Sequence, residues 1–293
     1  MRILVLSSVI ALTLAACTSE KQVVDAPAAA PPESAMVEAA PAVDAWEVAL
    51  NGAHRSPENR ARDVHRHPRE TLEFFGIKGN QTVVEITPGG GWFTEVLAPV
   101  LKAQGSLIAA VPDPSTAPSD GAKNYFTRGN EALRAKLSAD TATYGGVKVV
   151  EFKVREPNFG PSGSADLVVT FRNVHNWTGW GSDAQMFKAF FDVLKPGGVL
   201  GVEEHRAKPG TTIEQSKKSG YLATDYVIKL ATDAGFKVDG QAEINANPKD
   251  TADHPNGVWN LPPSLSVKEG EDKAKYQAIG ESDRMTLRFV KPA

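Results

Sequence analysis

The sequence predicts an α/β fold, a doubly wound and mainly parallel sheet that an antiparallel hairpin closes. Three observations lead to this class. The apolar run Val83 to Ile86 breaks into the glycines 89–91, and apolar residues then recur at helical spacing from Phe93 to Val100. Strand-like and helix-like stretches go on alternating as far as Ile244, and a last strand is expected from Arg284 to Val290. A chain of 293 residues suits one such domain with extended ends.

The remaining elements follow from periodicity and from stop signals. Runs of β-branched and other apolar residues predict strands, and apolar residues every three or four positions predict helices. Lys195-Pro196-Gly197-Gly198 marks a helix stop before a strand. The expected strands are 106–111, 147–154, one beginning at 165, 199–203 and 235–244, and the expected helices are 123–138, 186–194 and 221–234.

The three glycines point to a ligand. Glycine allows positive φ and removes side chains, so that backbone N–H groups and the positive end of the next helix can approach a bound molecule. A simple chain reversal is the alternative. Glu85 inside the strand, and a second strand one helix later, favour the first βαβ unit of a nucleotide-binding sheet. A dinucleotide fingerprint would need a third glycine where the chain has Thr94, so an NAD-dependent oxidoreductase is a weaker alternative.

Glu85, Thr87, Gly89 and Gly91 stand at two-residue steps and resemble the first motif of class I S-adenosylmethionine-dependent methyltransferases. More narrowly, the run from Glu85 to Trp92 is similar to a group of exported bacterial predicted methyltransferases. The resemblance spans most of residues 46–292. It implies a Rossmann-like sheet of seven strands and S-adenosyl-L-methionine as cofactor, held by Glu85, Thr87, Gly89, Gly90 and Gly91. Thr87 departs from the glycine of most members, which implies a looser loop.

The same resemblance assigns a ribose contact. In class I methyltransferases an acid at the end of the second strand accepts hydrogen bonds from the ribose hydroxyls, and Asp113 is the nearest match, about two residues late. A plain turn aspartate before proline is the competing interpretation. Asp166 corresponds to the acid that starts the fourth strand of the family.

Polar and aromatic residues gather after the strand that begins at Ala165, at the sheet edge where ligands of parallel sheets sit. We expect His175 on a mobile loop, and we favour a functional site over a solvated surface. His175 is the candidate general base, and Arg172 and Asn173 are assigned to the cofactor. The substrate residues are Asn176, Trp177, Glu204 and Trp259. Glu203, Glu204 and His205 close the next strand at the same edge, so that one of them could face substrate, and the paired carboxylates could equally be capped or solvated.

Two segments flank this domain, an N-terminal extension (46–80) and a long insertion (247–283). The extension carries Arg62, His65, Arg66, His67 and Arg69, for which a solvated helix face is the default interpretation. The alternative is that it folds over the site and lends Arg62, Asp63 or His67 to the substrate. No metal ligands are predicted, because alternate histidines share a face only in a strand and a third ligand is not evident. The insertion is expected to be a lid or disordered.

The N-terminus predicts export. Arg2 precedes an apolar segment too short for a permanent span, and Leu14-Ala15-Ala16-Cys17 resembles a lipoprotein processing site. We therefore expect a signal peptide (1–16), a lipidated Cys17 with an Ala/Pro-rich linker (17–45), and the domain at 46–293. This places the domain on the periplasmic face of the outer membrane, attached only through lipid. Cys17 is the single cysteine, so an intrachain disulfide is excluded. A small apolar residue in a signal helix is the alternative reading.

The formal net charge of −3, without a long Lys/Arg run, disfavours nucleic acid as a partner. A small-molecule substrate is expected. The first functional hypothesis is methyl transfer from S-adenosylmethionine to a small or exposed acceptor, and the second is a binding module without turnover, since supply of this cofactor in the periplasm is uncertain. The sequence leaves the acceptor and the oligomeric state open.

Overall fold

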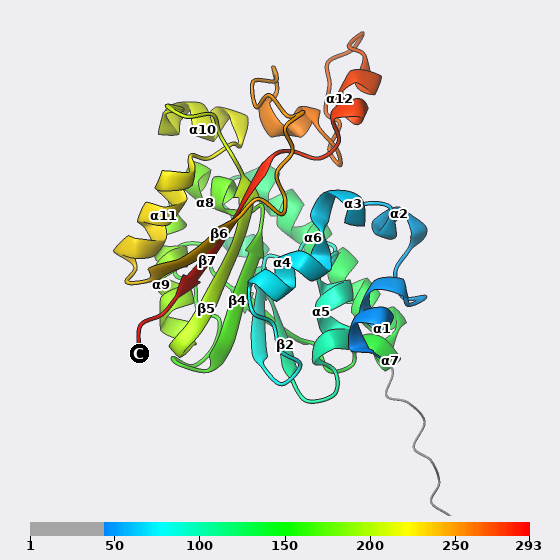
Figure 1. Ribbon diagram of the computed structural model, residues 1–293, viewed down its shortest axis with the longest axis vertical. Coiled ribbons are helices and arrows are strands. Elements are labelled where there is room, and N and C mark those ends of the chain that lie inside the picture. The colour runs from blue at the N-terminus through cyan, green and yellow to red at the C-terminus, as the bar shows by residue number, and fades with distance from the viewer. Residues whose placement is uncertain (1–43) are drawn as a thin grey trace, which may run out of the picture. The chain divides into compact units, whose positions relative to one another are not determined.

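A computed structural model describes residues 44–293, which form a seven-stranded sheet in the order β3-β2-β1-β4-β5-β7-β6. The predicted signal peptide, Cys17 and the linker up to residue 43 lie outside the described residues. Strand β7 runs antiparallel to both β5 and β6, whereas the other pairs are parallel. The predicted doubly wound α/β sheet with a closing hairpin is therefore confirmed (Figure 1). Its strands are β1 Thr82–Ile86, β2 Ser106–Pro112, β3 Lys148–Phe152, β4 Ala165–Phe171, β5 Leu194–His205, β6 Lys237–Ala242 and β7 Arg284–Val290.

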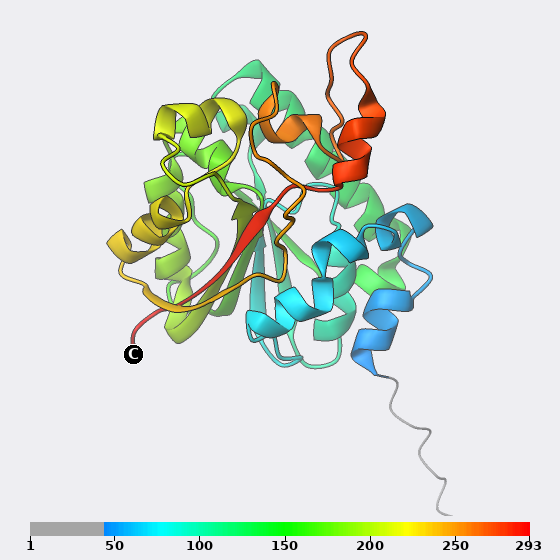
Figure 2. The same cartoon turned by 45° about the horizontal axis from the view of Figure 1, so that its top comes forward.

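Helices cover both faces of the sheet, because alternate residues of the buried strands pack in opposite directions. Val84 and Val168 pack with α8 (Val174–Trp180), α9 (Asp183–Val193) and α11 (Thr224–Asp233). Val83 and Leu167 pack on the other face. The helices that contribute to this second cluster are α1 Ala45–Asn51, α4 Pro68–Phe74, α5 Thr94–Leu101 and α7 Thr141–Tyr144. Figures 1 and 2 show the two helical layers on either side of the sheet.

The predicted elements differ from the structure mainly at their ends. The helix expected at 221–234 begins only at Thr224, and the strand expected to reach Ile244 ends at Ala242. The short helix α10 at Ile213–Ser219 was not predicted. The insertion is folded and not disordered. The remaining elements are α2 Pro57–Arg60, α3 Asp63–Arg66, the 3₁₀ helix η1 Pro114–Thr116, α6 Asp120–Ala139, α10 Ile213–Ser219, the 3₁₀ helix η2 Gly257–Asn260 and α12 Lys273–Ile279.

Asp166 ties the sheet together at its amino-terminal edge. Its Oδ2 accepts a hydrogen bond from the backbone N–H of Thr82 at 2.8 Å, and its Oδ1 pairs with Lys195 at 2.6 Å. Burial acts to raise the pKa of Asp166, but the contacts with Lys195 and Thr82 hold it below its ordinary value. The carboxylate thus fixes the start of β1 against β4 and β5, at the end opposite the carboxyl ends of the strands.

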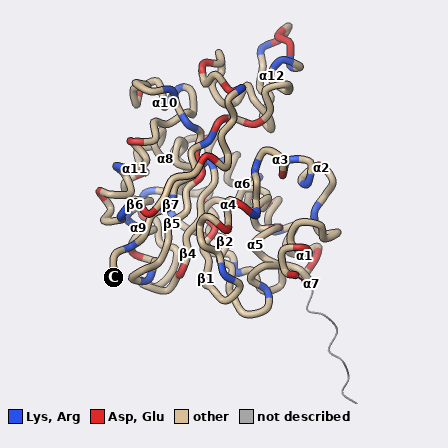
Figure 3. Tube along the Cα trace, in the orientation of Figure 1, with Lys and Arg blue, Asp and Glu red and all other residues tan. Residues whose placement is uncertain are grey.

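Acidic and basic residues are interspersed along the described chain (Figure 3). Within residues 44–293, no helix combines the length and the apolar character that a membrane crossing requires.

Candidate active site

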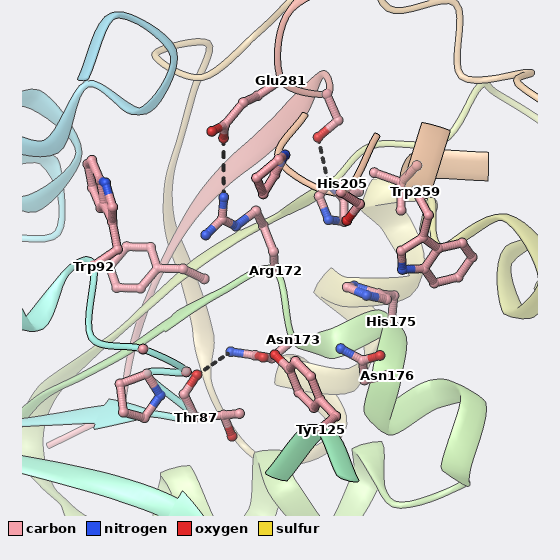
Figure 4. Close-up of a pocket in the computed structure, with 18 of the residues that line it drawn as sticks. Thr87, Trp92, Tyr125, Arg172, Asn173, His175, Asn176, His205, Trp259 and Glu281 are labelled. Atoms are coloured by element: carbon pink, nitrogen blue, oxygen red, sulfur yellow. Dashed lines mark hydrogen bonds and ion pairs between the residues drawn. The ribbon is translucent and has the colours of Figure 1, made fainter. Parts of the chain in front are cut away.

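A cavity of about 790 Å³ opens at the carboxyl ends of β1, β4 and β5 (Figure 4). Its wall is built from segments that are distant in the sequence: the turn after β1, the segment after β4, the end of β5, the start of α6, the N-terminal extension and the insertion. Its lining includes Arg62, Arg66, Glu85, Thr87, Gly89, Gly90, Arg172, Asn173, His175, Asn176, His205, Trp259 and Glu281. The two flanking segments of the sequence therefore meet at the edge where the sheet was expected to hold its ligand.

The glycine turn (residues 87–91) presents two of its three glycines to this cavity. Gly89 has a φ of 57°, and a Cβ built there would meet no described atom within 4 Å. A Cβ on Gly91 would instead lie 2.8 Å from Cδ1 of Leu133 in α6. Gly91 is not among the lining residues, because its missing side chain makes room for a helix of the protein itself. The structure therefore does not place its predicted cofactor contact at the cavity.

Two non-glycine residues follow neighbouring strands in the left-handed conformation. Thr87, after β1, has a φ of 52°, and Arg172, after β4, has a φ of 59°. Such backbone is costly for side-chain-bearing residues and concentrates at functional sites. Nδ2 of Asn173 donates to the backbone oxygens of Ile86 at 3.2 Å and Thr87 at 3.4 Å, which joins the two strand ends. Thr87, a β-branched residue, therefore holds a conformation that glycine would adopt at lower cost.

Glu85 lies buried beneath the glycine turn, as expected. Its Oε2 accepts a hydrogen bond from Oγ1 of Thr94 at 2.6 Å. Burial raises the pKa of Glu85 to about 7, since the contacts with Thr94 and Lys136 only partly offset the loss of water. The carboxyl is consequently poised between its neutral and charged forms near neutral pH, and a cationic ligand above it would favour the charged form.

His175 is not on a mobile loop: it lies in α8, and only 8% of the residue is exposed. Its Nδ1 is 3.0 Å from Oε1 of Glu204, and its backbone N–H donates to Oε2 at 3.1 Å. An ionised carboxylate can only accept, so Nδ1 carries the hydrogen and Nε2 keeps its lone pair. Nε2 makes no hydrogen bond to the described residues. His175 has the arrangement of a general base that a carboxylate orients.

Glu204 itself is fully buried and is not a lining residue. Its placement differs from the predicted substrate contact, because the carboxylate stands behind His175 instead of facing the cavity. This pairing could not be read from the sequence, because a helix residue and a strand residue 29 positions apart meet only in the folded chain.

His205, at the end of β5, lines the cavity as a second imidazole, whereas Glu204, the residue of this strand end that was assigned to the substrate, does not. Its Nδ1 is 2.6 Å from Oγ of Ser282, and its ring centroid is 5.0 Å from that of His175. Burial, with the neighbouring His175 and Arg172, holds the pKa of His205 well below its usual range. The ring is therefore neutral at neutral pH.

His175, Glu204 and His205 offer donor atoms within 4.8 Å of one another, a spacing that a divalent cation could bridge. The sequence predicts no metal ligands, and its patterns do not bring these three residues together. Oε1 of Glu204, however, already accepts hydrogen bonds from Nδ1 of His175 and from the backbone N–H of His205 at 2.7 Å. In this arrangement the carboxylate is engaged in orienting the imidazole.

An arginine cluster surrounds one carboxylate in another part of the cavity wall. The carboxylate of Glu281, in the insertion, contacts the guanidinium groups of Arg62 at 2.8 Å, Arg66 at 2.9 Å, and Arg172 and Arg284 at 3.2 Å. Figure 4 shows the pair of Arg172 and Glu281 above the cavity. Burial acts to raise the pKa of Glu281, but the guanidinium charges outweigh it and hold the pKa well below its ordinary value.

The default interpretation of the extension as a solvated face is wrong for Arg66, whose side chain is 2% exposed, and right for Arg69, which is 46% exposed and pairs with Glu73. Arg62 lines the cavity as its alternative predicted. The other two residues named in that alternative do not: Asp63 pairs with Arg55, and His67 lies 3.4 Å from Asn245.

Trp259 lies in η2 of the insertion, with its ring centroid 6.2 Å from that of His175, and lines the cavity together with Asn176. Trp177 differs from its predicted substrate role in position: it is 2% exposed and packs in the core beneath the sheet. In a helix the side chains of residues 176 and 177 point to different faces, so the predicted pair could not both reach the ligand.

Asp113 also lies outside the lining. Its Oδ1 and Oδ2 accept hydrogen bonds from the backbone N–H and the hydroxyl of Ser115, both at 2.8 Å, and it caps η1. These contacts, the hydroxyl first, hold the pKa of Asp113 below its ordinary value. The geometry is that of the competing turn interpretation.

Comparison with solved structures places this architecture among S-adenosylmethionine-dependent methyltransferases. A methyltransferase of this kind from Aquifex aeolicus superposes with a TM-score of 0.51 at 14% identity, covering 80% of this chain and 93% of that one. The S-adenosylmethionine-dependent methyltransferase SibL gives 0.50 at 12% identity over 80% and 57%. SpnF, a [4+2]-cyclase, gives 0.51 at 14% identity over 78% and 81%. No family model and no curated protein matches the sequence.

At these identities the likeness establishes the fold, which is the Rossmann-like fold of S-adenosylmethionine-dependent methyltransferases. The presence of a cyclase among the similar structures shows that this fold hosts more than one chemistry. The fold alone therefore does not define the activity of this chain.

Proposed function

We propose that the protein is an S-adenosylmethionine-dependent methyltransferase acting on a small acceptor. The observation that carries the proposal is that one cavity brings together a ligand-accepting glycine turn and an imidazole that a carboxylate orients. A pure binding module would need the first feature but has no use for the second.

The residues present fit the cofactor. No described atom lies within 4 Å of the position that a Cβ of Gly89 would occupy, so the backbone of the turn is open to a ligand. The turn is followed by the amino-terminal end of α5. Oγ1 of Thr87 is buried without a hydrogen-bond partner among the described residues, as expected of an atom that awaits a ligand. Glu85 lies beneath, with a pKa that a nearby cation would lower. Glu85, Thr87, Gly89, Gly90 and Asn173 would hold the cofactor.

S-adenosylmethionine supplies a methyl group on a sulfonium that is already activated. The chain therefore has to orient the acceptor in line with that group, to exclude water and to accept a proton where the acceptor carries one. Asn176 and Trp259 line the cavity beside His175. Nε2 of His175 is the atom that takes the proton. Glu204 keeps the proton on Nδ1 and stabilises the imidazolium that results.

The location of this activity belongs to the proposal. The Arg2 to Cys17 segment supports export and a lipid anchor at Cys17, which would attach the domain to the periplasmic face of the outer membrane. In that compartment the runner-up function, a ligand-binding module of the same fold without turnover, rests on the uncertain supply of cofactor.

The test is a titration of the full chain with S-adenosylmethionine and S-adenosylhomocysteine by calorimetry, with NAD as the control nucleotide. We expect both adenosyl ligands to bind and NAD not to bind. A radiolabelled methyl donor offered with fractionated extract should then label a small-molecule fraction. Binding without any transfer would favour the non-catalytic module, and binding of NAD alone would refute the proposal.

A further inference from the structure

The part of the cavity wall around Glu281 carries more positive charge than the protein itself neutralises. Four guanidinium groups, from Arg62, Arg66, Arg172 and Arg284, surround Glu281. The only other carboxylate in contact with them among the described residues is Glu203, which lies 2.7 Å from Arg284. Even with Glu204 counted, the positive charges exceed the negative ones. A buried excess of this kind is costly unless an anion compensates it.

Two of the arginines have donors to spare. Arg66 makes its side-chain hydrogen bonds through Nε alone, and its guanidinium lies 4.6 Å from the ring centroid of Trp92, which fixes its plane. Arg172 makes one side-chain hydrogen bond, from Nη1 to Glu281. Both residues line the cavity, so their remaining N–H groups are available to a ligand. Planar guanidinium groups in pairs suit a carboxylate or phosphate group, which they can bind with two hydrogen bonds each.

The backbone supports the same orientation. Arg172 is held in the left-handed conformation, with its N–H donating to the backbone oxygen of Glu203 at 2.7 Å. A strained position of this kind is maintained where the side chain has a task. Arg62, 26% exposed, lies at the solvent side of the cluster, which leaves the cluster open to an entering ligand.

The cofactor alone does not balance this charge. The sulfonium and ammonium groups of S-adenosylmethionine outnumber its single carboxylate by one charge, which the ionised form of Glu85 would offset, so binding of the cofactor leaves the excess at the arginines in place. The compensating anion must come from the second ligand. From this, and resting on the proposed function, we infer that the methyl acceptor carries an oxyanion, a carboxylate or a phosphate group, that Arg62, Arg66 and Arg172 bind.

The experiment measures binding of benzoate, inorganic phosphate and neutral benzamide to the full chain by calorimetry in low-chloride buffer, with and without S-adenosylhomocysteine. We expect at least one of the two anions to bind and benzamide not to bind, and the tighter anion identifies the acceptor group. Arg62→Gln and Arg172→Gln should each weaken anion binding by about tenfold, since each removes a charge-assisted contact. Arg69→Gln, on the same extension but outside the cavity, should leave it unchanged.

Glu281→Gln should act in the opposite direction and tighten anion binding, because it removes the carboxylate that competes for the arginines. A general loss of structure could not produce changes of opposite sign. If Glu281→Gln does not fold, the two arginine variants still decide the question, because both side chains are partly exposed.

Equal anion affinity in the wild type and in both arginine variants would overturn the inference, as would failure of both anions to bind. A third result would overturn it differently. If Arg172→Gln weakens S-adenosylhomocysteine but not 5′-methylthioadenosine, which lacks the amino-acid tail, and leaves anion binding intact, the arginines hold the cofactor's own carboxylate. If the wild type binds anions through the arginines but no adenosyl ligand, the oxyanion site stands and the proposed methyltransferase function fails.

Discussion

The two halves of the cavity are built from different kinds of sequence. The half that would hold the cofactor comes from one continuous stretch, Glu85 to Gly90, with Asn173, which follows the adjacent strand β4. The half that faces the acceptor joins the N-terminal extension, the end of β4 and the insertion, and its contact between Arg66 and Glu281 spans 215 positions. A local motif shows itself in the sequence, whereas a wall assembled from distant segments shows itself only in the fold.

The halves also differ in charge. The glycine turn lies above the carboxyl of Glu85, whose pKa burial raises to about 7, whereas the arginine cluster keeps an excess of positive charge. Substitutions in the first half should therefore change cofactor affinity, and those in the second half should change use of the acceptor.

The largest expected effect is on turnover. His175→Ala should lower kcat by about 10²- to 10⁴-fold, the usual cost of losing a positioned base. The affinity for S-adenosylhomocysteine should change less than about twofold, because the histidine belongs to the acceptor half. Single-turnover kinetics and calorimetry on the same preparations measure the two quantities.

His67→Ala is the matched control, since that ring lies outside the lining. Glu204→Gln should lose part of the rate and alter the pH profile, because the amide no longer stabilises the imidazolium. A His175→Ala enzyme as fast as the wild type would leave the fold intact and remove the base from the mechanism.

The next effect is on stability and concerns the cofactor half. The pKa of Glu85 is about 7 in the folded protein and near 4.5 in the unfolded chain, so the folded state holds the proton more tightly between these pH values. Stability from this carboxyl is therefore present at low pH and lost as the pH rises through that window. At about 1.4 kcal/mol per pKa unit, the loss in the free energy of unfolding amounts to at most about 3.5 kcal/mol.

Glu85→Gln has the same shape and does not ionise, so it isolates this contribution from the titrating histidines. The difference in the free energy of unfolding between wild type and variant, from urea titrations at several pH values, should shift in favour of the variant from pH 4.5 to 7. A difference that does not vary with pH would mean that Glu85 is charged throughout.

These contrasts show what could be read from the sequence. The sheet, the glycine turn and Glu85 follow from periodicity and from residue types with few conformational options. Arg66 was misassigned because a charged residue on a short helix is exposed by default, and only its partners Glu281 and Trp92 make burial tolerable. The substrate role predicted for Trp177 does not match its position. The segment after β4 becomes a helix at once, so that the side chains of residues 176 and 177 point in different directions and Trp177 packs in the core.

A smaller effect separates two adjacent glycines. Gly90→Val should weaken S-adenosylhomocysteine binding by about tenfold, or about 1.4 kcal/mol, because the residue lines the cavity and its Cβ would have only Ala132 near it, at 3.9 Å. Its folding should be nearly unaffected.

Gly91→Ala should show the reverse pattern, since the new Cβ meets Leu133 and the φ of 79° disfavours any side chain. It should lower the melting temperature more than it lowers the affinity of the protein that remains folded. Loss of affinity in Gly91→Ala with full stability would mean that the turn moves towards its ligand.

The smallest expected effect tests the border of the cofactor half. Asp113→Asn should change S-adenosylhomocysteine affinity less than about twofold, because both carboxylate oxygens already accept hydrogen bonds from Ser115 and the residue is not part of the lining. An asparagine still caps η1, so the fold should not change. The family resemblance makes the opposite prediction, a ribose contact worth tenfold or more. Calorimetry with S-adenosylhomocysteine and with a 2′,3′-dideoxy analogue distinguishes the two: if the variant loses affinity for the first ligand and not for the second, Asp113 turns towards the ribose on binding, and the cofactor half extends one strand further than its free geometry indicates.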